Sequence, residues 1–194
     1  MTNTLLYYEE NAKNFIASTL TVNMHEIQDE FLSLLHEGSL ILDYGCGSGR
    51  DSKYFLEKGF KVDAFDGCKA FCDEASKLTG IAVKNIVFSD FSENQKYDGI
   101  WACSSLLHAP KKELPHLLKK IEEALKPNGI FYCSFKKGDF EGERNGRHFS
   151  DFTKEELINL VRNSTNLSEV KIWQTKDARA DRSDIWINSI WQKC

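Results

Sequence analysis

Three glycines stand at every second position of a short turn that follows an apolar segment. Residues 40–42 are apolar, Asp43 follows them, and Gly45, Gly47 and Gly49 make up the turn. Glycine lets a backbone bend sharply and approach a ligand closely, because no Cβ stands in the way. The helix expected after the turn begins with backbone N–H groups that lack partners within the helix. This pattern predicts a ligand-binding loop between a strand and a helix.

Two residues beside these glycines indicate the charge of the ligand. A nicotinamide dinucleotide site has a third small residue three positions after the second glycine, and its helix points at a pyrophosphate. Here Arg50 occupies that position, and Asp43 precedes the first glycine. A carboxylate repels a pyrophosphate and attracts a cation. S-adenosylmethionine carries a sulfonium and an ammonium and no phosphate, so the sequence favours this donor over a nicotinamide cofactor.

Two more aspartates follow predicted strands. Asp66 ends the second strand, about twenty residues beyond the turn, where an acidic side chain can accept hydrogen bonds from both ribose hydroxyls. Asp90 follows the third strand, where a carboxylate can accept from an adenine amino group while Phe91 covers the ring. Aspartates at strand ends also form loops and cap helices. Because all of these carboxylates fall at strand ends, we favour a donor site that contains them.

One histidine lies where an acceptor would meet the donor. His108 comes just after the predicted fourth strand, residues 99–103. Methyl transfer from a sulfonium depends mainly on positioning, and a general base is needed only when the acceptor arrives protonated. His108 is therefore our candidate base or acceptor contact. The alternative is a histidine that caps its loop or packs against the donor.

Four arginines lie in two late segments that we expect at the carboxyl ends of the strands. Residues 136–150 are glycine-rich and charged, and we expect a mobile loop over the mouth of the site. Guanidinium groups that converge there suit a carboxylate, a phosphate or a metalloid oxyanion. In the alternative, they pair with nearby acids in a solvated loop. The predicted acceptor contacts are Arg144, Arg147, Arg179 and Arg182, and the acids are Asp139, Glu141, Glu143, Asp177 and Asp181.

The N-terminal segment, residues 1–22, precedes the predicted sheet. Its residues Tyr7, Tyr8, Asn11 and Phe15 recur at near-helical spacing. They suit a lid across the donor, with Tyr8 in contact with the acceptor. They equally suit ordinary packing against the edge of the sheet.

Short apolar strands alternate with helical patterns from about residue 24 onward, which is typical of a parallel α/β sheet. Thr153 and Glu156 form a capping box that begins one helix. Two apolar runs near the C-terminus predict a hairpin. The predicted fold is one doubly wound, Rossmann-like α/β domain that spans residues 1–194 in three layers. The expected strands are residues 40–42, 61–65, 85–88, 99–103, 130–135, 170–174 and 185–191.

Composition excludes several classes of protein. The chain has 194 residues and a formal net charge of -4, which argues against a nucleic-acid partner because such domains carry a basic excess. No apolar run reaches the roughly 20 residues that span a bilayer, and residues 1–10 lack the pattern of a signal peptide. The six cysteines are scattered, so we expect no metal site, no disulfide and a reducing, cytoplasmic location. We expect a monomer or a weak homodimer.

Four stretches of the chain resemble class I S-adenosylmethionine-dependent methyltransferases. They are ILDYGCGSGRDSKYFLEKGFKVDAFDG from residue 41, SDF from residue 89, KYDGIWACSSLLHAP from residue 96 and ALKPNGIFYCSFK from residue 124. More narrowly, the chain is similar to the small tellurite-resistance (TehB-like) branch. The resemblance implies a seven-stranded sheet of order 3-2-1-4-5-7-6 with strand 7 antiparallel. Because the likeness begins at Tyr7, before the core fold, it favours the lid interpretation of the N-terminal segment.

The resemblance also assigns roles by position. It implies that residues 103–108 form the wall beside the sulfonium. At this point the chain lacks the Asn/Asp-Pro-Pro-Tyr/Phe motif, which argues against enzymes that methylate amino groups of DNA. The implied cofactor-binding residues are Asp43, Gly45, Cys46, Gly47, Arg50, Asp66, Gly67, Asp90, Phe91 and Cys103.

The leading hypothesis is a methyltransferase that produces S-adenosylhomocysteine and acts on a small acceptor, either an anion or a soft nucleophile. Two alternatives stay open. Methyltransferases that act on the carboxyl group of a modified tRNA wobble base share this layout, although the acidic balance of this chain argues against them. A non-catalytic donor-binding subunit would have the same donor motifs.

Overall fold

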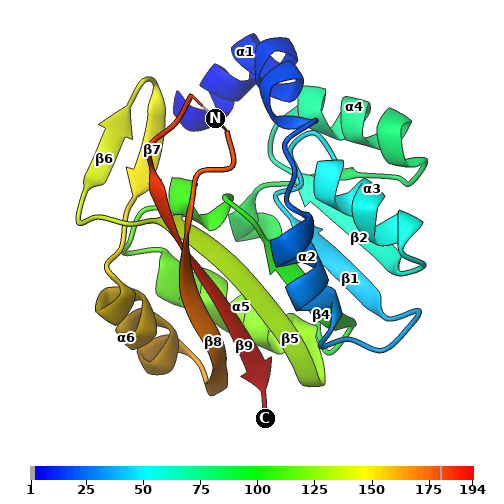
Figure 1. The fold of residues 1–194 in the computed structure, drawn as a ribbon, viewed down its shortest axis with the longest axis vertical. Coiled ribbons are helices and arrows are strands. Elements are labelled where there is room, and N and C mark those ends of the chain that lie inside the picture. The colour runs from blue at the N-terminus through cyan, green and yellow to red at the C-terminus, as the bar shows by residue number, and fades with distance from the viewer. Residues whose placement is uncertain (1–2, 180) are drawn as a thin grey trace.

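A computed structural model describes residues 3–179 and 181–194 of the chain. Its central sheet has seven strands in the order β3-β2-β1-β4-β5-β9-β8 (Figure 1). The first five run parallel, and β9 is antiparallel to both β5 and β8. This confirms the predicted strand order and the antiparallel last strand. The strands are β1 Leu40–Tyr44, β2 Lys61–Asp66, β3 Lys84–Asn85, β4 Tyr97–Ala102, β5 Leu125–Lys136, β8 Leu167–Lys176 and β9 Ile185–Lys193.

Helices cover both faces of the sheet and complete the three predicted layers (Figure 1). Successive residues of β1 serve opposite faces, because side chains alternate along a strand. Ile41 packs in the core beneath α2 and α3, and Leu42 packs in the core beneath α5 and α6. The helices are α1 Asn3–Thr19, α2 His25–Leu32, α3 Arg50–Glu57, α4 Lys69–Thr79, α5 Leu114–Ala124 and α6 Lys154–Ser164. The predicted capping box of Thr153 and Glu156 begins α6.

The third strand is shorter than the sequence predicts. Only Lys84 and Asn85 pair with β2, and the chain then enters a short 3-10 turn, Phe88–Asp90. Aromatic packing explains the early end of the strand. The Phe88 ring stacks on Tyr44 with centroids 5.0 Å apart, and Phe91 is buried in the core. Stacking of the half-buried Phe88 on Tyr44, together with burial of Phe91, outweighs the extended preference of the apolar run.

Residues 136–150, expected to form a loop, contain an antiparallel hairpin instead. Its strands are β6 Glu141–Arg144 and β7 Arg147–Ser150. The turn between them is Asn145-Gly146, and both residues have positive φ, 52° and 76°. Asn-Gly is the preferred sequence for a two-residue hairpin turn, so this signal was present in the sequence. The hairpin is tied to α1, because the backbone N–H of His148 donates to Thr4 Oγ1 at 2.9 Å.

No helix within residues 3–179 and 181–194 is long and apolar enough to cross a membrane. Over the same residues, no group of three or more histidine, cysteine, aspartate or glutamate side chains is arranged to hold a metal ion.

Candidate active site

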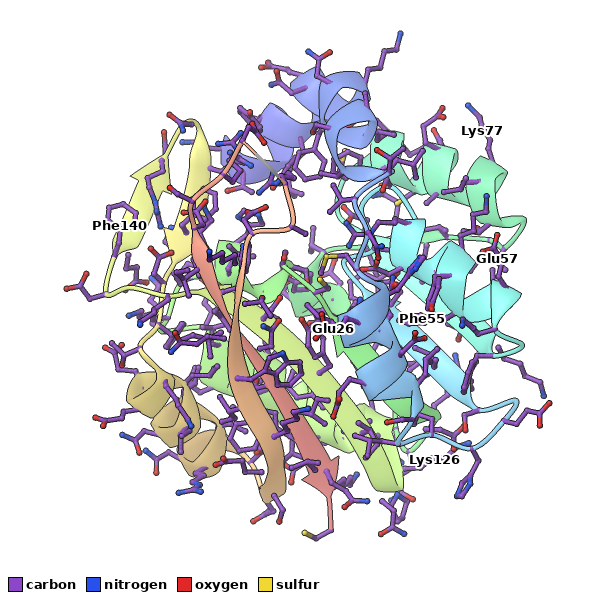
Figure 2. The ribbon with its side chains drawn as sticks, viewed as in Figure 1. Glu26, Phe55, Glu57, Lys77, Lys126 and Phe140 are labelled. Carbon is purple, nitrogen blue, oxygen red and sulfur yellow. The ribbon has the colours of Figure 1, made fainter. Side chains whose placement is uncertain are left out.

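A cavity of about 1290 Å³ opens at the carboxyl ends of β1, β2 and β4. Ligands of open α/β sheets bind at this end, where the order of the strands reverses. Helix α1 and the β6–β7 hairpin lie at the same end of the molecule (Figure 1), and both contribute to the cavity wall. Glu26 points from α2 toward this cavity, whereas Lys77 lies on the outer surface of α4 (Figure 2). Single-ligand pockets are usually about 300–1,000 Å³, so this volume has room for a donor and a small acceptor.

The three glycines of the turn have different structural roles. All of them have positive φ, which disfavours a side chain. A Cβ on Gly45 would lie 2.7 Å from the Cβ of Ser105, and one on Gly49 would lie 2.9 Å from that of Ala75. A Cβ on Gly47 would meet no atom within 4 Å, and Gly47 lines the cavity. Gly45 and Gly49 therefore allow close packing, and Gly47 leaves space for a ligand.

This difference predicts two stability effects. We expect Gly45→Ala to lower the free energy of unfolding by about 3 kcal/mol, because left-handed strain adds to a steric clash. Gly47→Ala should cost only about 1–2 kcal/mol, from strain alone. Gly59→Ala is the matched control, since Gly59 has a φ of 86° with open space around it. Denaturant unfolding measures all three, and equal losses for Gly45→Ala and Gly59→Ala would contradict the packing role.

Two carboxylates, the buried Asp43 and the half-buried Asp66, line the cavity without a cationic partner among the described residues. Asp43 accepts a hydrogen bond of 2.6 Å from Ser52 Oγ. Burial, together with the nearby Asp51 carboxylate, raises the pKa of Asp43 well above its usual range. Asp66 accepts from the backbone N–H groups of Gly47 at 2.9 Å and Cys68 at 2.8 Å. Burial raises the pKa of Asp66 to about 6 despite these bonds. A cationic ligand in this cavity would stabilise the ionised form of both groups.

Arg50, a predicted donor contact, is already neutralised by a neighbour. Its Nε and Nη2 donate to Asp51 at 2.6 and 2.9 Å, although the side chain also lines the cavity. Burial alone would raise the pKa of Asp51, but the Arg50 guanidinium and hydrogen bonds from Trp101 and Gln28 hold it below its usual range. Because Arg50 is paired, it does not cancel the charge of Asp43 and Asp66.

Asp51 lines the cavity and was missed by sequence reasoning, as were Trp101 and Gln28, which hold its carboxylate from outside the cavity wall. The Nε1 of Trp101 and the Nε2 of Gln28 both donate to the Asp51 carboxylate at 2.8 Å. These three residues come from different elements, β4, α2 and the start of α3. Only the position of Asp51 directly after the glycine turn offered a signal. The partners meet through the fold, so local spacing could not identify them.

The predicted adenine contacts do not lie in the cavity wall. Asp90 is exposed and lies beside a separate hollow, and Phe91 stacks on Phe65 within the core. The turn at residues 88–90 is the physical reason, because it brings Val87, Phe88 and Ser89 to the cavity in their place. The side chains of Asp90 and Phe91 therefore lie outside the wall of this cavity, and their contact with adenine stays a prediction.

The remaining predicted donor contacts do line the cavity. Cys46 lies in the turn, Gly67 follows β2 and Cys103 follows β4. A Cβ on Gly67 would lie 2.8 Å from Leu5, so α1 packs closely on this residue. Burial raises the pKa of the Cys103 thiol to about 12, so it is neutral at physiological pH and unsuited to nucleophilic attack. Ser104 beside it has a φ of 53°, an uncommon backbone conformation at the end of β4.

His108 is held between α1 and β7. Its Nε2 lies 2.8 Å from the Tyr8 hydroxyl, and its Nδ1 lies 2.7 Å from the backbone carbonyl of His148. Burial is the main cause that lowers the pKa of His108 to about 4, and the nearby charge of Arg147 lowers it further. The imidazole is therefore neutral at physiological pH. Tyr8 and His108 both line the cavity.

The four predicted acceptor arginines differ in their partners. Arg144 pairs with Asp151 and packs over Phe140, which lies at the outer edge of the hairpin (Figure 2), and it does not line the cavity. Arg179 pairs with Asp177 at 2.7 Å, and Arg182 pairs with Asp181 at 3.5 Å. Asp177 and Asp181 are acids that the paired alternative named and Asp151 is not, and both Arg179 and Arg182 line the cavity.

Arg147 differs from the other three arginines. No described carboxylate lies within ion-pair distance of it, and its buried Nε has no hydrogen-bond partner. Its guanidinium packs over the rings of Tyr7 and Phe149 at 4.7 and 5.1 Å, and its Nη1 lies 3.4 Å from the Tyr8 hydroxyl. The side chain lines the cavity. Arg147 thus presents a positive charge that the described residues do not neutralise.

Comparison with known proteins agrees with this geometry. The profile of a family described as a methyltransferase domain matches residues 12–169. Alpha N-terminal protein methyltransferase 1 of Dictyostelium discoideum is 37% identical over 100 residues, which cover 47% of this chain and 37% of that protein. The chain spans about a third of the length of the curated relatives it matches, 37% and 33%.

Two solved structures show the same fold. A Burkholderia thailandensis 1,6-didemethyltoxoflavin-N1-methyltransferase, with 1,6-didemethyltoxoflavin and S-adenosylhomocysteine bound, superposes with a TM-score of 0.79 at 22% identity and covers 97% of this chain and 84% of its own. A TehB-like S-adenosylmethionine-dependent methyltransferase from Corynebacterium glutamicum has a TM-score of 0.73 at 16% identity, with 98% of both chains covered. The chain therefore belongs to the methyltransferase-domain family and has the class I, S-adenosylmethionine-dependent methyltransferase fold.

Proposed function

We propose that this protein transfers a methyl group from S-adenosylmethionine to a small acceptor that carries an anionic group. One observation carries the proposal. The same cavity is lined by carboxylates from β1 and β2, Asp43 and Asp66, and by a guanidinium from β7, Arg147, and none of the three has an ion-pair partner among the described residues. The carboxylates suit a cationic donor, and the guanidinium suits an anion.

The residues around the glycine turn fit the donor. Asp43 and the backbone of Gly45 to Gly47 would hold the amino acid end, because the carboxylate suits an ammonium and Gly47 leaves open space. Asp66 would accept from the ribose hydroxyls, since its carboxylate lines the cavity. Val87, Phe88 and Ser89 would take the place of the predicted adenine contacts.

When bound, the donor supplies an electrophilic methyl group on a sulfonium. The protein then contributes mainly by holding the two reactants in the right orientation. This can lower the activation free energy of a reaction between two molecules by about 7–11 kcal/mol. Arg147 would hold the anionic group of the acceptor, and the aromatic rings of Tyr7 and Phe149 cover its faces. The Tyr8 hydroxyl lies beside Arg147 and would contact the acceptor, and His108 lies behind it, hydrogen-bonded to that hydroxyl. Arg179 and Arg182 would serve mainly as paired charges in the outer wall.

The affinity for S-adenosylmethionine should rise with pH between about pH 5 and pH 8. In the free protein, burial raises the pKa of Asp43 and of Asp66, the latter to about 6, so protonated carboxyl groups persist in this range. A cationic donor favours the ionised form, so binding releases protons and is weaker at low pH. Calorimetry in two buffers of different ionisation enthalpy counts the protons. An affinity independent of pH in this range would contradict the assignment.

Two experiments test the proposed function. Calorimetry with S-adenosylhomocysteine and with NAD tests the donor site, and tight binding of NAD alone would contradict it. Radiolabelled methyl transfer into fractionated cell extract then identifies the class of acceptor. We expect the label in a small anionic molecule.

The same transfer assay separates the alternatives. Label in bulk tRNA would support a tRNA wobble-base methyltransferase in place of our proposal. Donor binding without transfer to any fraction would support a non-catalytic donor-binding subunit. We further propose that the protein acts in the cytoplasm as a monomer or a weak homodimer, and size-exclusion chromatography with light scattering tests the assembly.

A further inference from the structure

Both ring nitrogens of His108 are occupied by neighbours. Nδ1 faces the backbone carbonyl of His148 at 2.7 Å, and a carbonyl oxygen only accepts hydrogen bonds. Nδ1 therefore carries the ring proton, and Nε2 offers its lone pair to the Tyr8 hydroxyl at 2.8 Å. As a result, His108 has no free lone pair for an acceptor. A proton from the cavity can reach this histidine only through Tyr8.

Tyr8 is placed to make that connection. Its oxygen has two lone pairs, and one of them accepts from Arg147 Nη1 at 3.4 Å. The other has no donor among the described residues and is open to a hydrogen-bond donor in the cavity, which Tyr8 lines. The Tyr8 hydroxyl therefore lies between a cavity ligand and His108, beside the same arginine that would hold the anionic group of the acceptor.

Resting on the methyl transfer proposed above, we propose that Tyr8 is a catalytic residue that takes the proton of the acceptor and passes its own proton to His108. The proton on the attacking atom moves to Tyr8 Oη, while the Tyr8 proton moves to His108 Nε2. The freed electron pair of the acceptor forms the bond to the methyl carbon, and the pair of the broken carbon–sulfur bond stays on sulfur. The positive charge lost from the sulfonium thus appears on the imidazolium, so atoms and charge balance.

The surroundings of the pair act on both proton transfers. Burial raises the pKa of Tyr8 to about 12, so the phenol does not ionise unaided, and burial lowers the pKa of His108 to about 4, so the imidazolium is short-lived. Arg147 would stabilise the charge that develops on the phenol oxygen during the transfer. The bond from the His148 amide to Thr4 ties β7 to α1, which keeps the two halves of the pair together.

Three variants test the relay, with the acceptor fraction labelled by the wild type as the probe and saturating donor. Tyr8→Phe and His108→Gln should each lower the transfer rate about 100-fold, the lower range of general-base effects. The double variant should be no slower than either single variant, because residues of one relay fail together. Tyr54→Phe is the matched control, since Tyr54 bonds to Asp29 outside the cavity. The affinity for S-adenosylhomocysteine should change little in the His108 variant.

Chemical rescue distinguishes proton transfer from a structural role. Imidazole should restore activity to His108→Gly, and more basic imidazoles should restore more. It should not restore the Tyr8→Phe/His108→Gly double variant, because the connecting hydroxyl is absent. Additive losses in the double variant, or full activity of His108→Gln, would overturn the relay.

A measurement without donor or acceptor completes the test. Nitrogen-15 NMR of the free protein should show His108 protonated at Nδ1 and hydrogen-bonded at Nε2. The chemical shift of Nε2 should change in Tyr8→Phe and not in Tyr54→Phe. A proton on Nε2 would overturn the relay. Donor binding without any transfer by the wild type would contradict the proposed function and the relay with it. Normal transfer by the Tyr8 and His108 variants would contradict the relay alone.

Discussion

Asp66→Asn will bind S-adenosylhomocysteine about 100-fold more weakly than the wild type, a loss of about 2.7 kcal/mol. The Asp66 carboxylate is held by the backbone N–H groups of Gly47 and Cys68, which leaves its other lone pairs for ligand hydroxyls. The amide of the variant has only one oxygen that accepts hydrogen bonds. Its NH₂ group would face either a backbone N–H group or a ligand hydroxyl, which also donate. Hydrogen bonds to a charged group contribute about 1.5–3 kcal/mol each, so the expected loss of affinity corresponds to at least one such bond. Titration calorimetry measures the affinity.

Asp63→Asn on the same strand is the matched control. Asp63 accepts from Tyr97 and pairs with Lys96 at 2.9 Å, outside the donor cavity. It should retain the affinity of the wild type within about twofold, since no direct ligand contact is lost. If Asp66→Asn binds the donor product as tightly as this control, the assignment of Asp66 to the ribose is wrong. Thermal unfolding of both variants checks that the fold is intact.

Arg147→Met will lower kcat/KM for the anionic acceptor about 100- to 1,000-fold, because a charge-assisted, bidentate contact is lost in a cavity of low dielectric. Methionine keeps an apolar chain against Tyr7 and Phe149, so the packing of the hairpin on α1 should survive. Arg147→Lys should recover only part of the activity, since an ammonium lacks the planar fork. Initial rates of methyl transfer measure both variants.

Arg162→Met is the matched control, because it removes an arginine that lies far from the proposed acceptor site. Arg162 pairs with Glu169 at 3.1 Å on the surface of α6, and the activity of this variant should match the wild type. Binding of S-adenosylhomocysteine should be unchanged in Arg147→Met. A parallel loss of donor affinity would indicate that Arg147 belongs to the donor site. An unchanged kcat/KM would contradict its assignment to the acceptor site.

Most of the predicted donor contacts line the cavity because the geometry that brings them together is local. Asp43, Gly45 and Gly47 fall within five residues, and a strand, a turn and a helix place them together. Asp66 ends the neighbouring parallel strand, and the carboxyl ends of such strands meet at one edge of the sheet. At the end of the third strand, packing of Phe88 on Tyr44 and of Phe91 on Phe65 turns the chain, so Asp90 lies outside the cavity wall and its contact with adenine stays a prediction.

The sequence by itself determined the fold, the strand order and the charge expected of the donor, because hydrophobic periodicity and glycine spacing act over short stretches of chain. Only the tertiary structure decided which charges on the acceptor side are free. Sequence reasoning named four arginines with equal weight, yet Asp151 neutralises Arg144 and Asp177 neutralises Arg179. Arg147 instead packs on α1, 139 residues from Tyr8 along the chain. Whether a charge is paired depends on which elements meet in space, and spacing along the chain does not contain that information.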